Sequence, residues 1–108
     1  MANNYKFTGV ALATVSQTAL LTAASGENII IKSITITNNT ANTPTVTLDV
    51  TDTSASASYQ ILRTHALTAN TSEGLITEPL VLEATDILKA TMSSTDSTTV
   101  TLSYLVIT

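Results

Sequence analysis

Apolar and polar residues alternate along three stretches of the chain. Between residues 45 and 51, valine and leucine at even positions alternate with threonine and aspartate at odd ones. Residues 86–93 and 99–106 repeat this pattern, and the second of them places Tyr104 on its apolar face. Because successive side chains of a strand point to opposite faces, each stretch predicts a strand with one buried and one solvated face. We therefore expect Tyr104 in the core.

The isoleucines of the segment 29–38 do not fit a single alternation. Ile29 and Ile31 lie at odd positions, whereas the two later isoleucines lie at even ones. One extra residue near positions 32–33 would bring all four to the same face. The pattern therefore predicts a β-bulge there, and a strand that is buried on both sides at its start is the alternative.

The remaining apolar runs are shorter, and turn-forming residues separate them. They predict strands at residues 5–12, 18–22, 58–66 and 78–83. Clusters of Ser, Thr, Asn, Asp, Gly and Pro favour a turn roughly every 10–15 residues. This spacing predicts an all-β fold, a single antiparallel β-sandwich (jelly-roll or Ig-like) of about 7–8 short strands. A helix over residues 11–24 is the main alternative, and its Thr and Ser content and missing cap disfavour it.

The length of the chain, 108 residues, predicts one domain. We find no internal repeat and no linker, so the β-sandwich domain is expected to span residues 1–108. Residues 1–12 have few apolar neighbours in the sequence, and they are a candidate N-terminal arm used in assembly.

Composition agrees with a strand-rich fold and argues against several classes of protein. The chain has 23 Thr and 11 Ser residues and is 44% hydrophobic, which favours half-buried pleated surfaces over disorder. With no Cys and one His, it can build neither a disulfide framework nor a usual zinc site. A net charge of −4 with four scattered basic residues disfavours nucleic-acid binding. No apolar run is long enough for a membrane span or continuous enough for a secretion signal, so we expect synthesis in a cytoplasm and no membrane partner.

Residues that could carry catalysis are sparse. His65 is the only histidine, and no Gly-x-Ser-x-Gly turn supplies a nucleophile. A pH switch at His65 is the functional alternative to a structural or surface role. Asp49 and Asp52 are three residues apart and would point to opposite faces of a strand. Three further acidic residues are expected to be solvated in turns or at strand starts: Glu73, Asp86 and Asp96. The sequence therefore predicts no enzymatic activity, no cofactor and no metal site.

Apolar side chains occur where the alternation predicts solvent. Leu105 and Ile107 lie on the face opposite to Tyr104, and without a bulge two isoleucines of the segment 29–38 would do the same. Such residues indicate either a core strand that is buried on both faces or a protein–protein interface. The candidate interface consists of Tyr5, Phe7, Ile29, Ile31, Leu105 and Ile107. Because Trp is absent and aromatic residues make up 4% of the chain, a stacking platform for glycans is disfavoured.

Five blocks of sequence, in the order in which they occur, carry a resemblance to a known group of proteins. They cover most of the chain and are Thr18–Ala23, Ile30–Asn38, Val46–Asp52, Pro79–Ala90 and Val100–Val106. In this order they resemble small β-sandwich virion structural proteins of tailed bacteriophages, notably those of marine and cyanobacterial phages. The chain departs from them at Ala23–Ser25, where related chains often have Pro or a bulkier residue, so the turn that follows is expected to differ.

The resemblance implies a subunit that is present in many copies on a phage particle. The capsid decoration (cement) proteins are the most similar, and they imply a protein that stabilises the head by bridging major capsid subunits. The implied partners are the major capsid protein or other virion subunits, together with copies of the same chain in a homo-oligomer. A tail, neck or fibre-base component and a receptor- or glycan-binding module are the alternatives, and a small hydrolase ranks below both.

Overall fold

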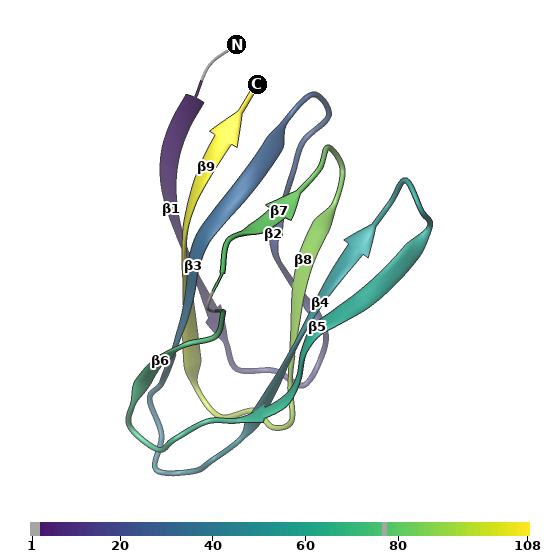
Figure 1. The fold of residues 1–108 in the computed structure, drawn as a ribbon. Coiled ribbons are helices and arrows are strands. Elements are labelled where there is room, and N and C mark those ends of the chain that lie inside the picture. Colours follow the sequence, from purple (N-terminus) through teal and green to yellow (C-terminus); the bar gives the residue numbers. More distant parts are fainter. Residues whose placement is uncertain (1–2, 77) are drawn as a thin grey trace.

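The computed structural model describes residues 3–76 and 78–108, and every regular element within them is a β-strand. Figure 1 shows these strands as an elongated sandwich in which the first and last strands lie side by side. The strands are β1 (Asn3–Leu12), β2 (Thr18–Thr22), β3 (Asn28–Asn38), β4 (Thr45–Asp52), β5 (Ala57–Ala66), β6 (Ser72–Gly74), β7 (Leu80–Leu82), β8 (Ile87–Met92) and β9 (Thr98–Ile107).

The strands form two antiparallel sheets around one core. The five-stranded sheet has the order β1-β9-β3-β6, with β7 also paired to β3, and the four-stranded sheet has the order β2-β8-β4-β5. The pairing is nested along the chain, because β4 pairs with β5, β3 with β6 and β7, β2 with β8, and β1 with β9. A long antiparallel hairpin rolled into two sheets in this way is a jelly roll. The predicted antiparallel β-sandwich is therefore confirmed, and the topology is the jelly roll rather than the Ig-like one.

The core is built from alternate positions of the long strands. Every second residue of β9, including Tyr104, is buried, as the alternation predicts. In β3 the register with β9 shifts between Ile31 and Ser33, which leaves Lys32 as an extra residue. The predicted bulge is thus confirmed: it brings the isoleucines at positions 29, 31, 34 and 36 to the core face, where each is 0–1% exposed. Burying an isoleucine side chain stabilises a fold by roughly 1.5–3 kcal/mol, so the bulge matters for the whole sheet.

Most predicted strands are found close to their expected bounds, and three expectations need comment. Residues 18–22 form β2, and no helix occurs in the described part of the chain, so the helical alternative is wrong. The strand β6 was not expected, which raises the total to nine. Within the candidate arm, residues 1 and 2 lie outside the described residues, and residues 3–12 are β1, paired with β9 at every position.

Candidate interaction surface

A row of apolar side chains crosses the outer face of the five-stranded sheet. Directly opposite residues of paired strands point to the same face. Tyr5 of β1 lies opposite Leu105 of β9, Leu105 lies opposite Ile30 of β3, and Ile30 lies opposite Val81 of β7. We call these four residues the apolar row. Because Leu105 and Ile30 each stand between buried neighbours in sequence, the row faces away from the core.

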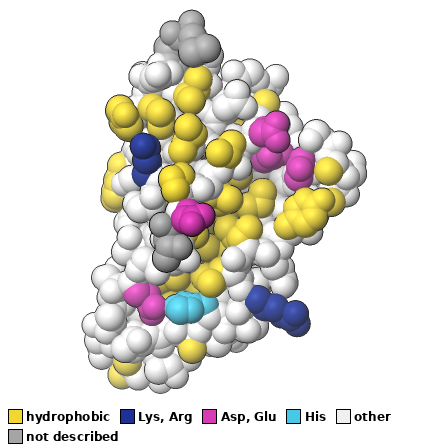
Figure 2. All heavy atoms as spheres, in the orientation of Figure 1, with side chains coloured by type: hydrophobic (Ala, Val, Ile, Leu, Met, Phe, Trp, Pro, Cys, Tyr) yellow, Lys and Arg dark blue, Asp and Glu magenta, His cyan; other side chains and the backbone are white. Residues whose placement is uncertain are grey.

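The apolar row is accessible to solvent, most of all at its two ends. Tyr5 is 78% exposed and Val81 is 57% exposed, and the two central residues are half-buried. Phe7, 70% exposed, and Ile107 flank the row on the same face. Figure 2 shows hydrophobic side chains gathered in the upper part of the molecule, where Figure 1 places β3, β7 and β9. A contiguous exposed patch of this kind is typical of an interaction site rather than of scattered surface residues.

The outer face of the four-stranded sheet has a different character. The outward positions of its central strands β4 and β8 carry mostly threonine and charged residues: Thr45, Thr47, Asp49, Thr51, Ile87, Lys89 and Thr91. Gln17 donates a hydrogen bond of 3.0 Å to Oδ2 of Asp49, and the other carboxylate oxygen of Asp49 has no hydrogen-bond partner. The two faces of the sandwich are therefore unequal, and the five-stranded sheet carries the apolar one.

The structure separates the predicted interface residues into two groups. Tyr5, Phe7, Leu105 and Ile107 all lie on the outer face of the five-stranded sheet. Their assignment to this one face follows from the register and not from their order in the sequence. Two further members of the row, Ile30 and Val81, were not predicted. For Ile30 the signal lay in the bulge, which puts Ile29 and Ile31 on the core face and so turns the side chain at position 30 outward.

The prediction that placed Ile29 and Ile31 in the interface is wrong. It depended on the absence of a bulge, and the structure has the bulge. The two side chains are 1% and 0% exposed, so they belong to the core and offer no surface to a partner.

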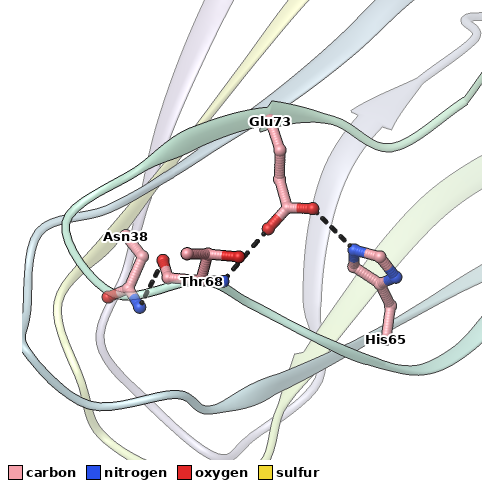
Figure 3. A network of polar contacts seen from close by, with 4 residues as sticks. All are labelled: Asn38, His65, Thr68 and Glu73. Atoms are coloured by element: carbon pink, nitrogen blue, oxygen red, sulfur yellow. Dashed lines mark hydrogen bonds and ion pairs between the residues drawn. The ribbon is translucent and has the colours of Figure 1, made fainter.

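His65 belongs to a polar network that joins the two sheets. Its Nε2 atom lies 2.8 Å from Oε2 of Glu73 on β6, and the other oxygen of Glu73 accepts a hydrogen bond of 3.2 Å from the backbone N–H of Thr68. The buried side chain of Asn38 donates to the carbonyl oxygen of Thr68 (3.3 Å) and to that of Asn42 (2.7 Å). Figure 3 shows one chain of contacts that runs from His65 through Glu73 and Thr68 to Asn38 at the end of β3.

The network also affects the ionisation of Glu73. The hydrogen bond from His65, helped by that from Thr68, holds the pKa of the Glu73 carboxyl below its usual value against the opposing effect of burial. Within the described chain, the hydrogen bond recorded for the His65 ring is the one with Glu73. The contact between His65 and Glu73 holds β6 against the end of β5 and so links the two sheets.

The acidic turn residues are held more firmly than expected. Asp86 is 5% exposed, and its two carboxylate oxygens accept hydrogen bonds from the backbone N–H groups of Thr53 and Glu83. The expectation of a solvated carboxylate is therefore wrong at Asp86, whereas the side chain of Glu73, which pairs with His65, is 25% exposed and partly solvated. Asp96 does lie in a turn, where hydrogen bonds from Ser94 and Asn42 lower the pKa of its carboxyl.

A pocket of about 380 Å³ opens between the edges of the two sheets. Its lining is mostly apolar and includes one carboxylate: Ile61, Leu75, Ile76, Glu78, Pro79 and Leu80. Neither His65 nor Glu73 is among the residues that line it. No convergent set of polar groups gives it a chemistry of its own.

Searches for other kinds of site and for relatives give few further constraints. Over residues 3–76 and 78–108, no group of three or more His, Asp or Glu side chains gathers to hold a metal ion. Nor is any helix of the described chain long and apolar enough to cross a membrane. A scan against models of protein families finds no match, and a search of curated proteins finds none either.

Proposed function

We propose that the protein is a virion structural protein of a tailed bacteriophage, a capsid decoration protein that bridges major capsid subunits and so stabilises the head. The observation that carries the proposal is the apolar row, which runs across β1, β9, β3 and β7 and is exposed at both ends. The resemblance of the sequence blocks to phage virion proteins supports it. The jelly roll supports it by analogy, since viral capsid domains share this architecture with lectins and cupins.

The mechanism of such a subunit is passive. The apolar row is presented on a rigid sheet, so little conformational entropy is lost when it meets a flat partner surface. Each copy contributes a modest contact, and many symmetric copies add their contributions. A ligand that binds an assembled state and not the separated subunits stabilises the assembled state by mass action. No bond is made or broken, so the proposal assigns no enzymatic activity.

A binding experiment with phage heads tests the proposal. Heads that lack the protein would be mixed with purified protein and separated by sedimentation, and the bound copies counted. We expect saturation at hundreds of copies per head and a higher temperature of head disruption. Saturation at a handful of copies would contradict decoration and favour a tail position. The absence of binding would also contradict decoration.

Two variants with the same change in charge serve as a matched pair in this experiment. Val81→Asp places a carboxylate in the apolar row, and we expect it to lower the affinity for heads at least tenfold. Thr91→Asp places one on the outer face of the four-stranded sheet, where we expect no more than a twofold change. Equal effects of the two variants would show that the apolar row is not the binding face.

A further inference from the structure

The strand β1 is an unpaired edge of the five-stranded sheet. It pairs with β9 at ten successive positions, from Asn3 opposite Ile107 to Leu12 opposite Thr98, without a shift in register. Within the described residues no strand pairs with its other side, as Figure 1 also shows. Alternate backbone N–H and C=O groups of β1 therefore point outward, and they form a template on which another strand can add.

The other sheet edges of the described chain are protected against such addition. The register of β5 with β4 shifts twice, and Thr64 in β5 has a positive φ of 44°. The strand β2 has five residues and a shift of its own, and β6 and β7 have three residues each. Bulges and short length are the usual means by which proteins blunt an edge. Among these edges, β1 alone is both long and regular.

The first half of β1 is exposed to solvent on both faces of the sheet and along its unpaired edge. All five residues from Asn3 to Phe7 are exposed, although they alternate between the two faces of the sheet. On the outer face, Tyr5 and Phe7 are 78% and 70% exposed. Two aromatic rings beside an unpaired strand edge bury little apolar area in the isolated chain, and a second strand laid along the edge would cover both.

We propose that a second copy of the chain adds to this edge, so that the two β1 strands pair antiparallel about a two-fold axis perpendicular to the sheet. This axis keeps the outer faces of both sheets on the same side. The apolar row of one copy then continues through Tyr5 and Phe7 into the row of the other. The inference concerns self-association and does not depend on the proposed function.

The side chains favour a register centred on Phe7 over one centred on Lys6. A perpendicular two-fold axis places some residue of β1 opposite itself in the second copy. If that residue were Lys6, two like charges would face each other, which is unfavourable. If it is Phe7, residues 3–11 pair, the two Phe7 rings become neighbours, and Tyr5 lies over Gly9 of the second copy. Gly9 leaves room for the ring, because the nearest heavy atom to a Cβ built there is Cγ2 of Thr101 at 3.9 Å.

The area of this contact fits a dimer that dissociates on dilution. An aromatic side chain buries about 150–250 Å² when it is fully enclosed, so the four largely exposed rings can contribute roughly 500 Å². The paired backbone and the remaining side chains add to this, which brings the total near the lower limit of about 1,000 Å² for a specific interface. We expect a dissociation constant of micromolar order rather than a permanent dimer.

Sedimentation equilibrium over a range of concentrations tests the association. We expect a reversible rise from the mass of one chain, 11.3 kDa, to twice that value. Phe7→Asp should raise the dissociation constant at least tenfold, whereas Val81→Asp, on the same face at the far end of the row, should leave it within twofold. A monomer at all concentrations, a trimer, or equal effects of the two variants would overturn the proposal.

Cysteine substitution tests the register, because the chain has no cysteine of its own. Opposed residues of antiparallel strands have Cβ atoms about 4.5–5.5 Å apart, within reach of a disulfide once the strands adjust slightly. Under mild oxidation, Phe7→Cys should form a covalent dimer at least tenfold faster than Tyr5→Cys. A mixture of Tyr5→Cys and Gly9→Cys should form the mixed dimer. A folded Phe7→Cys protein that does not cross-link faster than Tyr5→Cys would contradict this register.

Discussion

The pairing of His65 with Glu73 makes one contribution to stability depend on pH. The pKa of Glu73 is lowered in the folded protein from its ordinary value of 4.5, chiefly by the hydrogen bond from His65. A carboxyl with a depressed pKa stabilises the fold above its unfolded pKa, and this stabilisation is lost as the pH falls through the folded value. Because the two side chains are 36% and 25% exposed, the pair contributes at most about 1 kcal/mol.

We expect His65→Ala to raise the pKa of Glu73 toward its ordinary value. A carbon-detected NMR titration of the side-chain carboxyls measures the shift directly. Asp96 provides the control within the same spectrum, since its pKa is lowered by Ser94 and Asn42 and not by His65. The stability difference between variant and wild type should disappear at acid pH, where Glu73 is protonated in both. An unchanged Glu73 titration in the variant would show that the contact does not hold in solution.

The buried carboxylate of Asp86 is expected to matter more than any acidic residue of the exposed turns. Asp86→Ala leaves two backbone N–H groups, those of Thr53 and Glu83, without their acceptor. A fully buried donor left unpaired costs about 1–3 kcal/mol, and because these two contacts are only partly buried we expect a total loss of about 2 kcal/mol in the free energy of unfolding by urea. Asp52→Ala, which also removes an acceptor for its own turn, is the control, with a loss below about 1 kcal/mol. Similar losses in both variants would refute the distinction.

At the scale of single strands, alternation in the sequence predicted position and direction well wherever it was long. The bounds of β4, β5 and β8 lie within one or two residues of the expected ones. By contrast, β6 consists of Ser72, Glu73 and Gly74, which have no apolar residue to alternate. It is a strand because β3 and the contact with His65 hold it in place, and neither partner is visible from the local sequence.

The bulge in β3 gives a sharp test at this scale. Deleting Lys32 removes the extra residue and forces the isoleucines before and after it onto opposite faces. Two buried isoleucines would then face solvent, at roughly 1.5–3 kcal/mol each, and we expect the cooperative thermal transition measured by circular dichroism to be lost. Lys32→Ala keeps the bulge and alters only an exposed side chain, so its effect should stay within about 0.5 kcal/mol. A deletion variant that melts like wild type would refute this account of the bulge.

At the scale of the whole molecule, the sequence predicted a sandwich but could not choose its topology. The choice rests on contacts between residues that are far apart, above all the pairing of Asn3–Leu12 with Thr98–Ile107. For the same reason, the sequence could not predict the whole of the candidate interaction surface. Tyr5, Leu105, Ile30 and Val81 are scattered along the chain, and only the register of four strands brings them into one row. Local alternation can show that a side chain points outward, but it cannot show which outward side chains meet.

Val81 and Leu82 are neighbours in β7, and variants of these two residues distinguish the role of the apolar row from the role of the core. Val81 is 57% exposed in the apolar row, whereas Leu82 is 0% exposed and belongs to the core. We expect Val81→Asp to change the free energy of unfolding by less than about 1 kcal/mol, as surface substitutions usually do. Leu82→Asp places a carboxylate in an apolar interior with no partner, which should cost more than about 3 kcal/mol or prevent folding.

Urea unfolding of the two variants, followed by the head-binding assay on whichever protein folds, distinguishes a binding surface from a structural one. A folded Val81→Asp protein that binds heads at least tenfold more weakly is the expected result, because the added charge must be desolvated against the partner while the core is untouched. If Val81→Asp unfolds as readily as Leu82→Asp, the outer face of β7 is needed for the fold itself. In that case the apolar row would not be a binding surface, and a different face of the molecule would have to contact the capsid.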